Sequence, residues 1–204
     1  SLYNKLTDKE SLKTVLNENI PILGEIPFCD EQIIRPESRG LLIESFRLLR
    51  TNLNYLLINN KSKTILVTSS ILKEGKTFTS INLAQSLSLV NNNKVIVIGL
   101  DLRNPQIHKF LQINKDTNTG VTNYLLNNEE DINSLIHQHK SVDFDFILSG
   151  PIPPNPAELL LTERLNDIIE LAKKNYDYII LDTAPCVLVS DTLNLLKYAD
   201  ATIY

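Results

Sequence analysis

Short runs of apolar and β-branched residues alternate with longer amphipathic stretches, and this alternation limits the fold more than any other feature of the chain. The runs lie at Thr64–Thr68, Val95–Ile98, Phe144–Leu148, Tyr178–Leu181 and Ala201–Tyr204. Strands separated by helical patterns indicate βαβ units. Because most of these runs are apolar at consecutive positions, they are typical of parallel strands buried between two layers of helices. The sequence therefore predicts an α/β fold with a doubly wound, mostly parallel sheet.

The stretches between the runs have the periodicity of helices. Apolar residues recur at spacings of three and four over Glu37–Leu57, which predicts one buried face of a long helix. Further helices are expected over Gly75–Val90, Pro156–Lys174 and Ser190–Tyr198.

The domain organisation follows from length and local composition. At 204 residues the chain has the length of one α/β domain, which we place at residues 37–204. Residues 1–36 are mixed in character, and prolines hold Ile20–Pro27 extended, so a lead-in strand and linker are expected there. The chain starts at Ser1, contains no methionine and stops inside its last apolar run. We interpret it as a fragment that is incomplete at its C-terminal end.

The composition argues against several classes of protein. A net charge of -4, without a long basic run, gives no electrostatic footprint for nucleic acid. Cys29 and Cys186 lie far apart without the spacing of a zinc site or disulfide framework, which favours a reducing cytosol. No apolar run reaches the roughly 18 to 20 residues that cross a bilayer. We expect a cytosolic domain, with any membrane link outside this chain.

A phosphate-binding loop is predicted directly after the first strand. The segment Ser69–Thr77 ends in Gly-Lys-Thr and is followed by an apolar helical pattern. In such a loop, backbone N–H groups and the helix N-terminus attract phosphate, the lysine reaches the β and γ oxygens, and the hydroxyl binds Mg²⁺. Because Ser70 replaces the first glycine of the Walker A pattern GxxxxGK[ST], the assignment also depends on the flanking strand and helix. The expected nucleotide-binding residues are Ser70, Lys73, Glu74, Gly75, Lys76, Thr77 and Phe78.

Two other predicted strands end in a carboxylate. Asp101 follows the second strand after Gly99-Leu100, and Asp182 follows the fourth directly, at the position of a Walker B acid. Ligands of open α/β sheets bind at the carboxyl ends of strands, so Asp101, Asp182 and Thr77 are expected to hold Mg²⁺. A helix-capping role would explain either aspartate alone but not the set. Arg103 is expected to pair with Asp101, to contact phosphate, or to lie on the surface.

Taken together, these motifs resemble those of the bacterial tyrosine kinases, and the resemblance covers nearly the whole chain. That family adds two motifs to the Walker A loop and the Walker B aspartate. One is an ExxRxxR helix, matched here by Glu44, Arg47 and Arg50. The other is an acidic motif of the form DxDxR, called Walker A′, matched by Asp101 and Arg103.

Two departures from the family pattern stand out. Gly99 replaces the first aspartate of the DxDxR motif, which puts in doubt a mechanism that needs two carboxylates there. The tyrosine-rich C-terminal tail of the family is absent from this sequence, so the acceptor tyrosines are not identified. Residues 149–160 do resemble the family's loop before a late helix.

The resemblance implies a P-loop kinase domain with a MinD- and ParA-like fold over residues 37–204. Its implied activity is that of a non-specific protein-tyrosine kinase, an ATP-dependent autokinase that regulates exopolysaccharide or capsule biosynthesis and export. ATP or ADP with Mg²⁺ would be its cofactors. Lys76, Asp101, Asp182 and Arg103 would act in catalysis, mainly by positioning and electrostatics.

The resemblance also implies partners and a location. Glu44, Arg47 and Arg50 form a stripe away from the apolar face of their helix, where they would hold a ring-like homo-oligomer together. The implied partners are a membrane-anchored activator, in the same chain or a separate protein, and the polysaccharide export machinery. The domain would act at the cytoplasmic face of the bacterial inner membrane.

Two alternatives remain at this point. A MinD- or ParA-type ATPase switch shares the fold. That group has a signature lysine just after the first Walker A position, but this chain has Ile71 there, and Lys73 lies two residues later. A catalytically weak, nucleotide-gated adaptor of a polysaccharide export machine, which would work by conformational switching, stays open because of Gly99 and the missing tyrosine tail.

Overall fold

The computed structural model describes most of the chain. The described residues are 20–28, 33–35, 39–58, 62–90, 92–113, 119–126, 131–187 and 191–204. Cys29 and the expected start of the long helix at Glu37 lie outside them.

One sheet of five strands forms the centre of the domain. The strands are β1 (Lys63–Val67), β2 (Val95–Gly99), β3 (Asp145–Ile147), β4 (Tyr178–Asp182) and β5 (Ala201–Ile203). Their order across the sheet is β3-β2-β4-β1-β5, and every pairing is parallel. Each strand coincides with a predicted apolar run to within one or two residues, so the predicted strands are confirmed.

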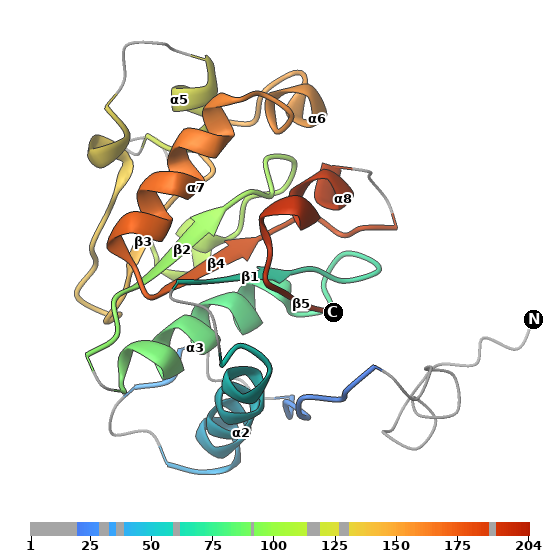
Figure 1. Cartoon of the computed structure of the whole chain (residues 1–204), viewed down its shortest axis with the longest axis vertical. Coiled ribbons are helices and arrows are strands. Elements are labelled where there is room, and N and C mark those ends of the chain that lie inside the picture. The colour runs from blue at the N-terminus through green and yellow to red at the C-terminus, as the bar shows by residue number, and fades with distance from the viewer. Residues whose placement is uncertain are drawn as a thin grey trace, which may run out of the picture.

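Helices cover both faces of the sheet (Figure 1), which confirms the doubly wound fold. On one face lie α2 (Leu41–Leu56), α3 (Lys76–Ser88) and the short α4 (Ile107–Phe110). On the other face lie α5 (Val121–Leu126), α6 (Pro156–Leu159), α7 (Arg164–Asn175) and α8 (Asp191–Leu195). Two 3₁₀ turns, η2 (Ile132–Leu135) and η3 (Leu196–Tyr198), complete the described elements.

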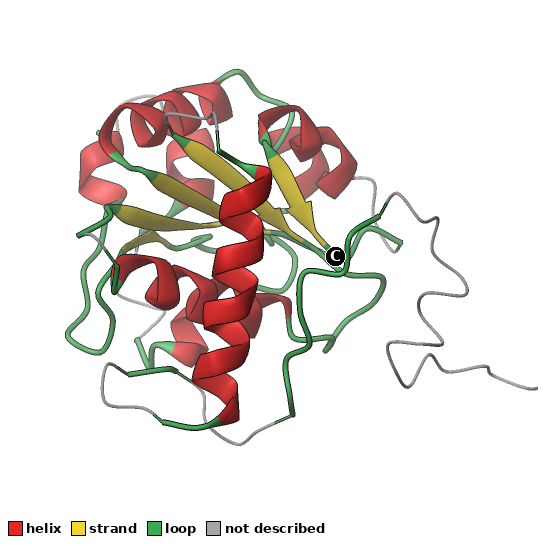
Figure 2. Ribbon diagram, turned by 60° about the horizontal axis from the view of Figure 1, so that its bottom comes forward, coloured by secondary structure: helices red, strands yellow, loops and turns green. Residues whose placement is uncertain are grey.

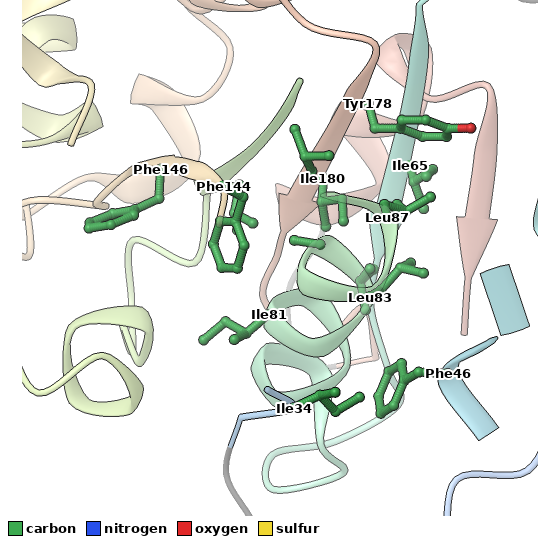
Figure 3. Close-up of a cluster of buried hydrophobic side chains, with 14 of the residues drawn as sticks. Ile34, Phe46, Ile65, Ile81, Leu83, Leu87, Phe144, Phe146, Tyr178 and Ile180 are labelled. Atoms are coloured by element: carbon green, nitrogen blue, oxygen red, sulfur yellow. The ribbon is translucent and has the colours of Figure 1, made fainter. Parts of the chain in front are cut away.

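Alternate residues of each strand enter two different cores. In β4, Tyr178 and Ile180 pack in the core beneath α2 and α3, whereas Ile179 and Leu181 pack in the core beneath α7. Figure 3 shows Ile180 and Ile65 from the strands meeting Leu83 and Leu87 of α3. Burial on both faces explains why the strands are apolar at consecutive positions.

The long helix α2 crosses outside α3 (Figure 2) and confirms the predicted buried face. Leu42, Phe46, Leu49 and Leu53 are buried, as their spacing predicted. Leu56 continues the same spacing but is 54% exposed, and Leu57, just after the helix ends, is buried instead. The ring of Phe46 packs against Phe78 with their centroids 5.9 Å apart.

Several predicted elements differ from the structure. No strand lies within the described residues 20–28, because two prolines interrupt that segment and no neighbouring strand pairs with it. The helix predicted over Pro156–Lys174 is instead two helices, α6 and α7, separated by a turn in which the Thr162 hydroxyl donates to the Leu159 carbonyl. The predictions also missed α4, α5 and η2, which are too short to show a helical period.

Part of the lead-in belongs to the domain core. Ile34 is 1% exposed, and its N–H donates to Asn82 Oδ1 of α3 at 2.7 Å. Leu23 and Ile26 also pack against this core. Within the described part of the chain, no helix is both long and apolar enough to span a membrane.

Candidate nucleotide-binding site

The pairing register aligns the carboxyl ends of three strands. Val67 of β1 is the partner of Asp182 in β4, and Gly99 of β2 is the partner of the same residue. The predicted phosphate loop, the Walker B aspartate and the Walker A′ segment therefore leave the sheet side by side, as expected.

The N-terminus of α3 is built to receive an anion. Gly75 adopts a left-handed conformation with φ 86°, which glycine accepts without strain, and α3 begins at Lys76. The first N–H to bond along the helix is that of Thr79, which donates to the Gly75 carbonyl. The N–H groups at residues 76–78 precede that bond, so they and the helix dipole are available to phosphate. Lys76 lies in the same turn and is 9% exposed.

The loop between β1 and α3 is fixed by its own hydrogen bonds. Glu74 Oε2 accepts from the Ile71 N–H at 3.0 Å, and Ser69 Oγ donates to the Ile71 carbonyl at 2.8 Å. Lys73 has φ 67° and is exposed. The hydroxyl groups of Ser70 and Tyr204 share a short hydrogen bond, which ties the loop to the residue after β5.

Two of the predicted nucleotide-binding residues use their side chains elsewhere. The Phe78 ring packs in the core against Phe46, so only its backbone N–H faces the helix start. The Glu74 carboxylate closes the loop rather than extending from it.

Asp182 is the centre of the site. It is 2% exposed, and both of its carboxylate oxygens accept hydrogen bonds from α3. Thr77 Oγ1 donates to Oδ2 at 2.8 Å, and Ser80 Oγ donates to Oδ1 at 3.1 Å. Ser80 was not among the predicted site residues, although it lies one helical turn after Thr77 on the same face.

The environment of Asp182 favours its protonated form in the ligand-free site. Burial raises the pKa of Asp182 to about 7, and the nearby charge of Asp101 adds to the rise. Hydrogen bonds from Thr77 and Ser80, and the charge of Lys76, act in the opposite direction. A cation next to Asp182 would replace the lost hydration and favour the carboxylate.

The residues around Asp182 fit a magnesium ion. Ligand oxygens about 2.1 Å from Mg²⁺ at adjacent octahedral positions lie roughly 3 Å apart, and Thr77 Oγ1 and Asp182 Oδ2 are 2.8 Å apart. Among the described residues, no group of three or more His, Cys, Asp or Glu side chains could hold a metal by itself. Magnesium commonly takes one or two carboxylates and completes its shell with phosphate and water.

Asp101 is held by a turn of its own. It is 7% exposed, and its Oδ1 accepts the N–H groups of Arg103 at 3.2 Å and Asn104 at 2.9 Å. Its own N–H donates to the backbone carbonyl of Asp182 at 3.0 Å. The two aspartates are therefore brought together, but one lies on a strand and the other on a turn.

Arg103 pairs with a residue that the sequence did not single out. Its Nε donates to Asp191 Oδ2 at 2.8 Å, and its Nη2 donates to Oδ1 at 3.3 Å. The expected alternative of a side-chain pair with Asp101 is wrong, since only the Arg103 backbone N–H reaches that carboxylate. Asp191 lies 88 residues away, so no local spacing could have indicated the pair.

Gly99 has a steric reason to be glycine. A Cβ atom at this position would lie 2.7 Å from Ser149 Oγ and 3.0 Å from Ser149 N. Ser149 follows β3 and is 4% exposed. An aspartate side chain at position 99, as in the family motif, would therefore clash with Ser149 in this chain.

The predicted stripe of α2 divides into two parts. Glu44 and Arg47 form an exposed ion pair at 2.6 Å. Arg50 instead donates through Nη1 to the Ser86 carbonyl of α3 at 2.5 Å. The expectation that all three side chains are free to meet another subunit is wrong for Arg50, because it already bonds α3. Arg47 and Arg50 also line a cavity of about 310 Å³ with Ile34 and Leu89.

These features define a P-loop nucleotide-binding domain: a strand, a phosphate loop, a helix carrying lysine and threonine, and a buried aspartate at the end of the neighbouring strand in the sheet. The family model described as "AAA domain" matches residues 62–204. YwqD, a tyrosine-protein kinase of Bacillus subtilis strain 168, is 32% identical over 171 residues, which cover 84% of this chain and 70% of that protein. The chain therefore belongs to the AAA domain family and to the bacterial tyrosine-protein kinases.

Other relatives agree with this assignment. The "putative tyrosine-protein kinase in cps region" of Klebsiella pneumoniae is 37% identical over 163 residues, which cover 80% of this chain and 22% of that protein. The solved kinase domain of the Escherichia coli tyrosine kinase ETK has a TM-score of 0.79 at 27% identity, covering 90% of this chain and 76% of that one. The MinD protein of Pyrococcus horikoshii, at a TM-score of 0.57 and 19% identity over 69% of this chain and 56% of that one, shares the fold.

The chain spans about a fifth of the Klebsiella protein, whereas it spans 70% of YwqD. The activity and partners of the longer relatives therefore come to this chain only as proposals.

Proposed function

We propose that this chain is the kinase domain of a tyrosine autokinase, which uses Mg²⁺ and ATP to regulate exopolysaccharide or capsule biosynthesis and export. The observation that carries the proposal is the 2.8 Å approach of Thr77 Oγ1 to the buried Asp182 carboxylate, at the start of the helix that presents Lys76. Support comes from relatives named tyrosine-protein kinases, one of them in a cps region. MinD, which shares the fold, was solved with Mg-ADP.

In this proposal the chain acts by positioning and electrostatics. The N–H groups at the start of α3 and the Lys76 ammonium hold the β and γ phosphates. Thr77, Asp182 and Asp101 hold Mg²⁺, which neutralises charge on the phosphates when bound. The Arg103 guanidinium contacts the transferring phosphoryl group. The acceptor hydroxyl loses its proton to a nearby carboxylate or to solvent.

Phosphotyrosine formation tests the activity. The full-length protein would be incubated with ATP and Mg²⁺, and phosphotyrosine would be located by mass spectrometry. Lys76→Ala should abolish both nucleotide binding and phosphotyrosine, since it removes the cation that meets the phosphates. Lys140→Ala, which removes an exposed lysine after η2, should leave both unchanged. Wild-type nucleotide affinity in Lys76→Ala would contradict the site assignment.

The same experiment separates the alternatives. ATP hydrolysis without phosphotyrosine would favour a MinD- or ParA-type switch. Nucleotide binding without hydrolysis would favour a nucleotide-gated adaptor. Gly99, which replaces the first aspartate of the DxDxR motif, is the sequence feature behind that alternative.

We also propose that the domain assembles into a ring-like homo-oligomer through the outer face of α2. Glu44 and Arg47 support this, because both are exposed and an arginine fork can grip a carboxylate of a neighbour. The apolar residues Leu41, Leu48 and Tyr55 are also exposed, and their spacing of seven puts them on one stripe beside that pair.

The assembly proposal predicts different results for the two arginines. Arg47→Ala should lower the mass of the oligomer measured by light scattering, with little change in the unfolding temperature. Arg50→Ala should lower the unfolding temperature, because it removes a charged bond to the Ser86 carbonyl worth about 1.5 to 3 kcal/mol. The same mass before and after Arg47→Ala would remove this pair from the interface.

The remaining parts of the proposal concern context. We place the domain, including the lead-in residues that pack against its core, at the cytoplasmic face of the bacterial inner membrane. Its partners would be a membrane-anchored activator segment and the polysaccharide export machinery, with no role for nucleic acid. Co-purification from membranes with and without the activator segment would test this placement.

A further inference from the structure

A buried carboxylate that the proposed chemistry does not use lies at the start of α8. The Asp191 side chain is 3% exposed, and its two oxygens accept Nε and Nη2 of Arg103 at 2.8 and 3.3 Å. A charge buried to this degree is costly unless it is paired and hydrogen-bonded. The arginine fork meets that need in a two-pronged geometry that lysine cannot copy.

This pair is fastened to all three loops of the nucleotide site. On one side, the backbone N–H of Arg103 donates to Asp101, the carboxylate of the Walker A′ turn. On the other side, Thr192 Oγ1 donates to the Ala184 carbonyl at 2.7 Å, just after β4. The same carbonyl accepts from Thr68 Oγ1 at 2.9 Å, where the phosphate loop begins. The first two residues of α8 thus connect the loops after β1, β2 and β4.

The hydrogen bonds to Asp191 fix the orientation of Arg103 and leave other guanidinium N–H groups available. They engage two of the five guanidinium N–H groups, while the Arg103 side chain stays 43% exposed. The hydrogen bond that Arg103 donates to Asp191 is the main cause that raises the pKa of Arg103, so the cation is firmly maintained. An arginine already held in one orientation loses little freedom when a phosphate arrives, and preorganised charge of this kind stabilises a transition state most.

We infer that Asp191 is a positioning residue for phosphoryl transfer, which orients the Arg103 guanidinium toward the phosphoryl group in transit. This inference rests on the proposed function, because it assigns Arg103 to that group. Asp191 itself touches neither nucleotide nor acceptor. Its effect should therefore appear in binding of a transition-state mimic and should disappear when Arg103 is absent.

The test is a double-mutant cycle on the full-length protein with Asp191→Asn and Arg103→Ala. The dissociation constants of Mg-ADP alone and of Mg-ADP with aluminium fluoride, a mimic of the transferring phosphoryl group, would be measured by calorimetry. In the wild-type background, Asp191→Asn should weaken the fluoride complex roughly tenfold or more and change Mg-ADP affinity less than about twofold. In the Arg103→Ala background it should change neither.

Two further variants keep the result interpretable. Asp177→Asn removes a carboxylate that accepts the Lys94 N–H at 2.8 Å at the amino-terminal ends of β2 and β4, away from the nucleotide site, and it should leave the fluoride complex unchanged. Arg103→Lys keeps the charge beside Asp191 but loses the fork, so it should weaken the fluoride complex even if Asp191→Asn fails to fold.

The outcomes separate this inference from the kinase assignment. Equal losses from Asp191→Asn with and without Arg103 would show a structural role and overturn the inference, as would no loss in either background. Full fluoride affinity in Arg103→Lys would overturn it as well. Absence of phosphotyrosine would overturn the kinase proposal alone, because the fluoride complex forms from Mg-ADP and requires no transfer to tyrosine.

Discussion

The ends of β4 and β2 lie side by side, yet they position their carboxylates in opposite ways. Asp182 is the last residue of β4, where the sheet fixes its backbone and two hydroxyls of α3 hold both oxygens. The last residue of β2 is Gly99, and the acid of that segment, Asp101, comes two residues later on a turn that holds it through backbone N–H groups. One carboxylate is set by long-range packing and the other by local geometry.

The contrast indicates which acid tolerates change. The Asp182 side chain is held by the sheet and by α3, so it cannot move without disturbing both. Its position therefore depends on the packing of the core. The Asp101 turn needs only an oxygen acceptor, which asparagine also supplies. The two ends should therefore respond differently to the same substitution.

The largest difference is expected from replacing each acid by asparagine. Asp182→Asn should lower phosphoryl transfer about 10²- to 10³-fold with a small change in nucleotide affinity, since the carboxylate acts on the developing charge. Asp101→Asn keeps the turn and should lower it only about tenfold. Steady-state kinetics on both variants would decide, and equal losses would break the proposed division between the two ends.

The pH dependence of stability should sharpen the same contrast. In the ligand-free protein Asp182 has a pKa of about 7, above the value near 3.9 in an unfolded chain. Between these values the folded state holds a proton that the unfolded state releases, so stability should fall as pH rises from about 4 to 7 and then level off. The contribution should be on the order of 2 to 4 kcal/mol.

Asp182→Asn is the control for the pH measurement. Chemical denaturation at pH 5 and pH 8 should show a smaller difference for this variant than for the wild type, by about two thirds of that contribution, because the part between pH 4 and pH 5 lies outside the measured range. A wild-type difference that survives in Asp182→Asn would assign the titration to other groups.

A smaller effect is expected at the glycine. Gly99→Ala should destabilise the chain by about 1 to 3 kcal/mol, because the added methyl meets Ser149. In a Ser149→Gly background the cost should fall, since the nearest contact, at 2.7 Å to Oγ, is gone. Gly24→Ala is a matched control, as its nearest atoms would lie 4.0 Å away in ordinary contact. Equal costs at both glycines would refute the steric account.

The smallest effect should come from Ser80. Ser80→Ala removes one of the two hydroxyls on Asp182 and should cost about 0.5 to 1.5 kcal/mol at pH 8, where the carboxylate is charged. Because hydrogen bonds to the charged form lower a carboxyl pKa, the pH at which stability levels off should move upward. Denaturation curves at several pH values would measure both changes. An unchanged profile would mean that Thr77 alone holds this acid.

The sequence predicted the parts of this molecule that depend on local pattern. The strands, the phosphate loop and Asp182 follow from apolar runs and from a motif read together with its neighbours. The same reasoning missed the side-chain partner of Arg103, because Asp191 is distant in the chain and meets it only after α8 packs. It also failed for Arg50, whose helical position pointed to the surface while its length allowed it to reach the Ser86 carbonyl.

Gly99 illustrates a further limit. Its departure from the family pattern was visible in the sequence, but the reason was not, since the crowding comes from Ser149, which follows β3 about 50 residues later in the chain. Short helices such as α5 were missed because six residues do not complete two turns, so no period is established.

Two contacts, one near each end of α3, hold α2 and α3 together. Phe46 packs on Phe78 in the first turn of α3, and Arg50 holds Ser86 in the last full turn of the same helix. These two contacts join α2 to both ends of α3, including the turn that carries Lys76. A molecule that bound α2 with a preference for one position of α3 would, by linkage, change nucleotide affinity by the same free energy by which the nucleotide changes its own binding.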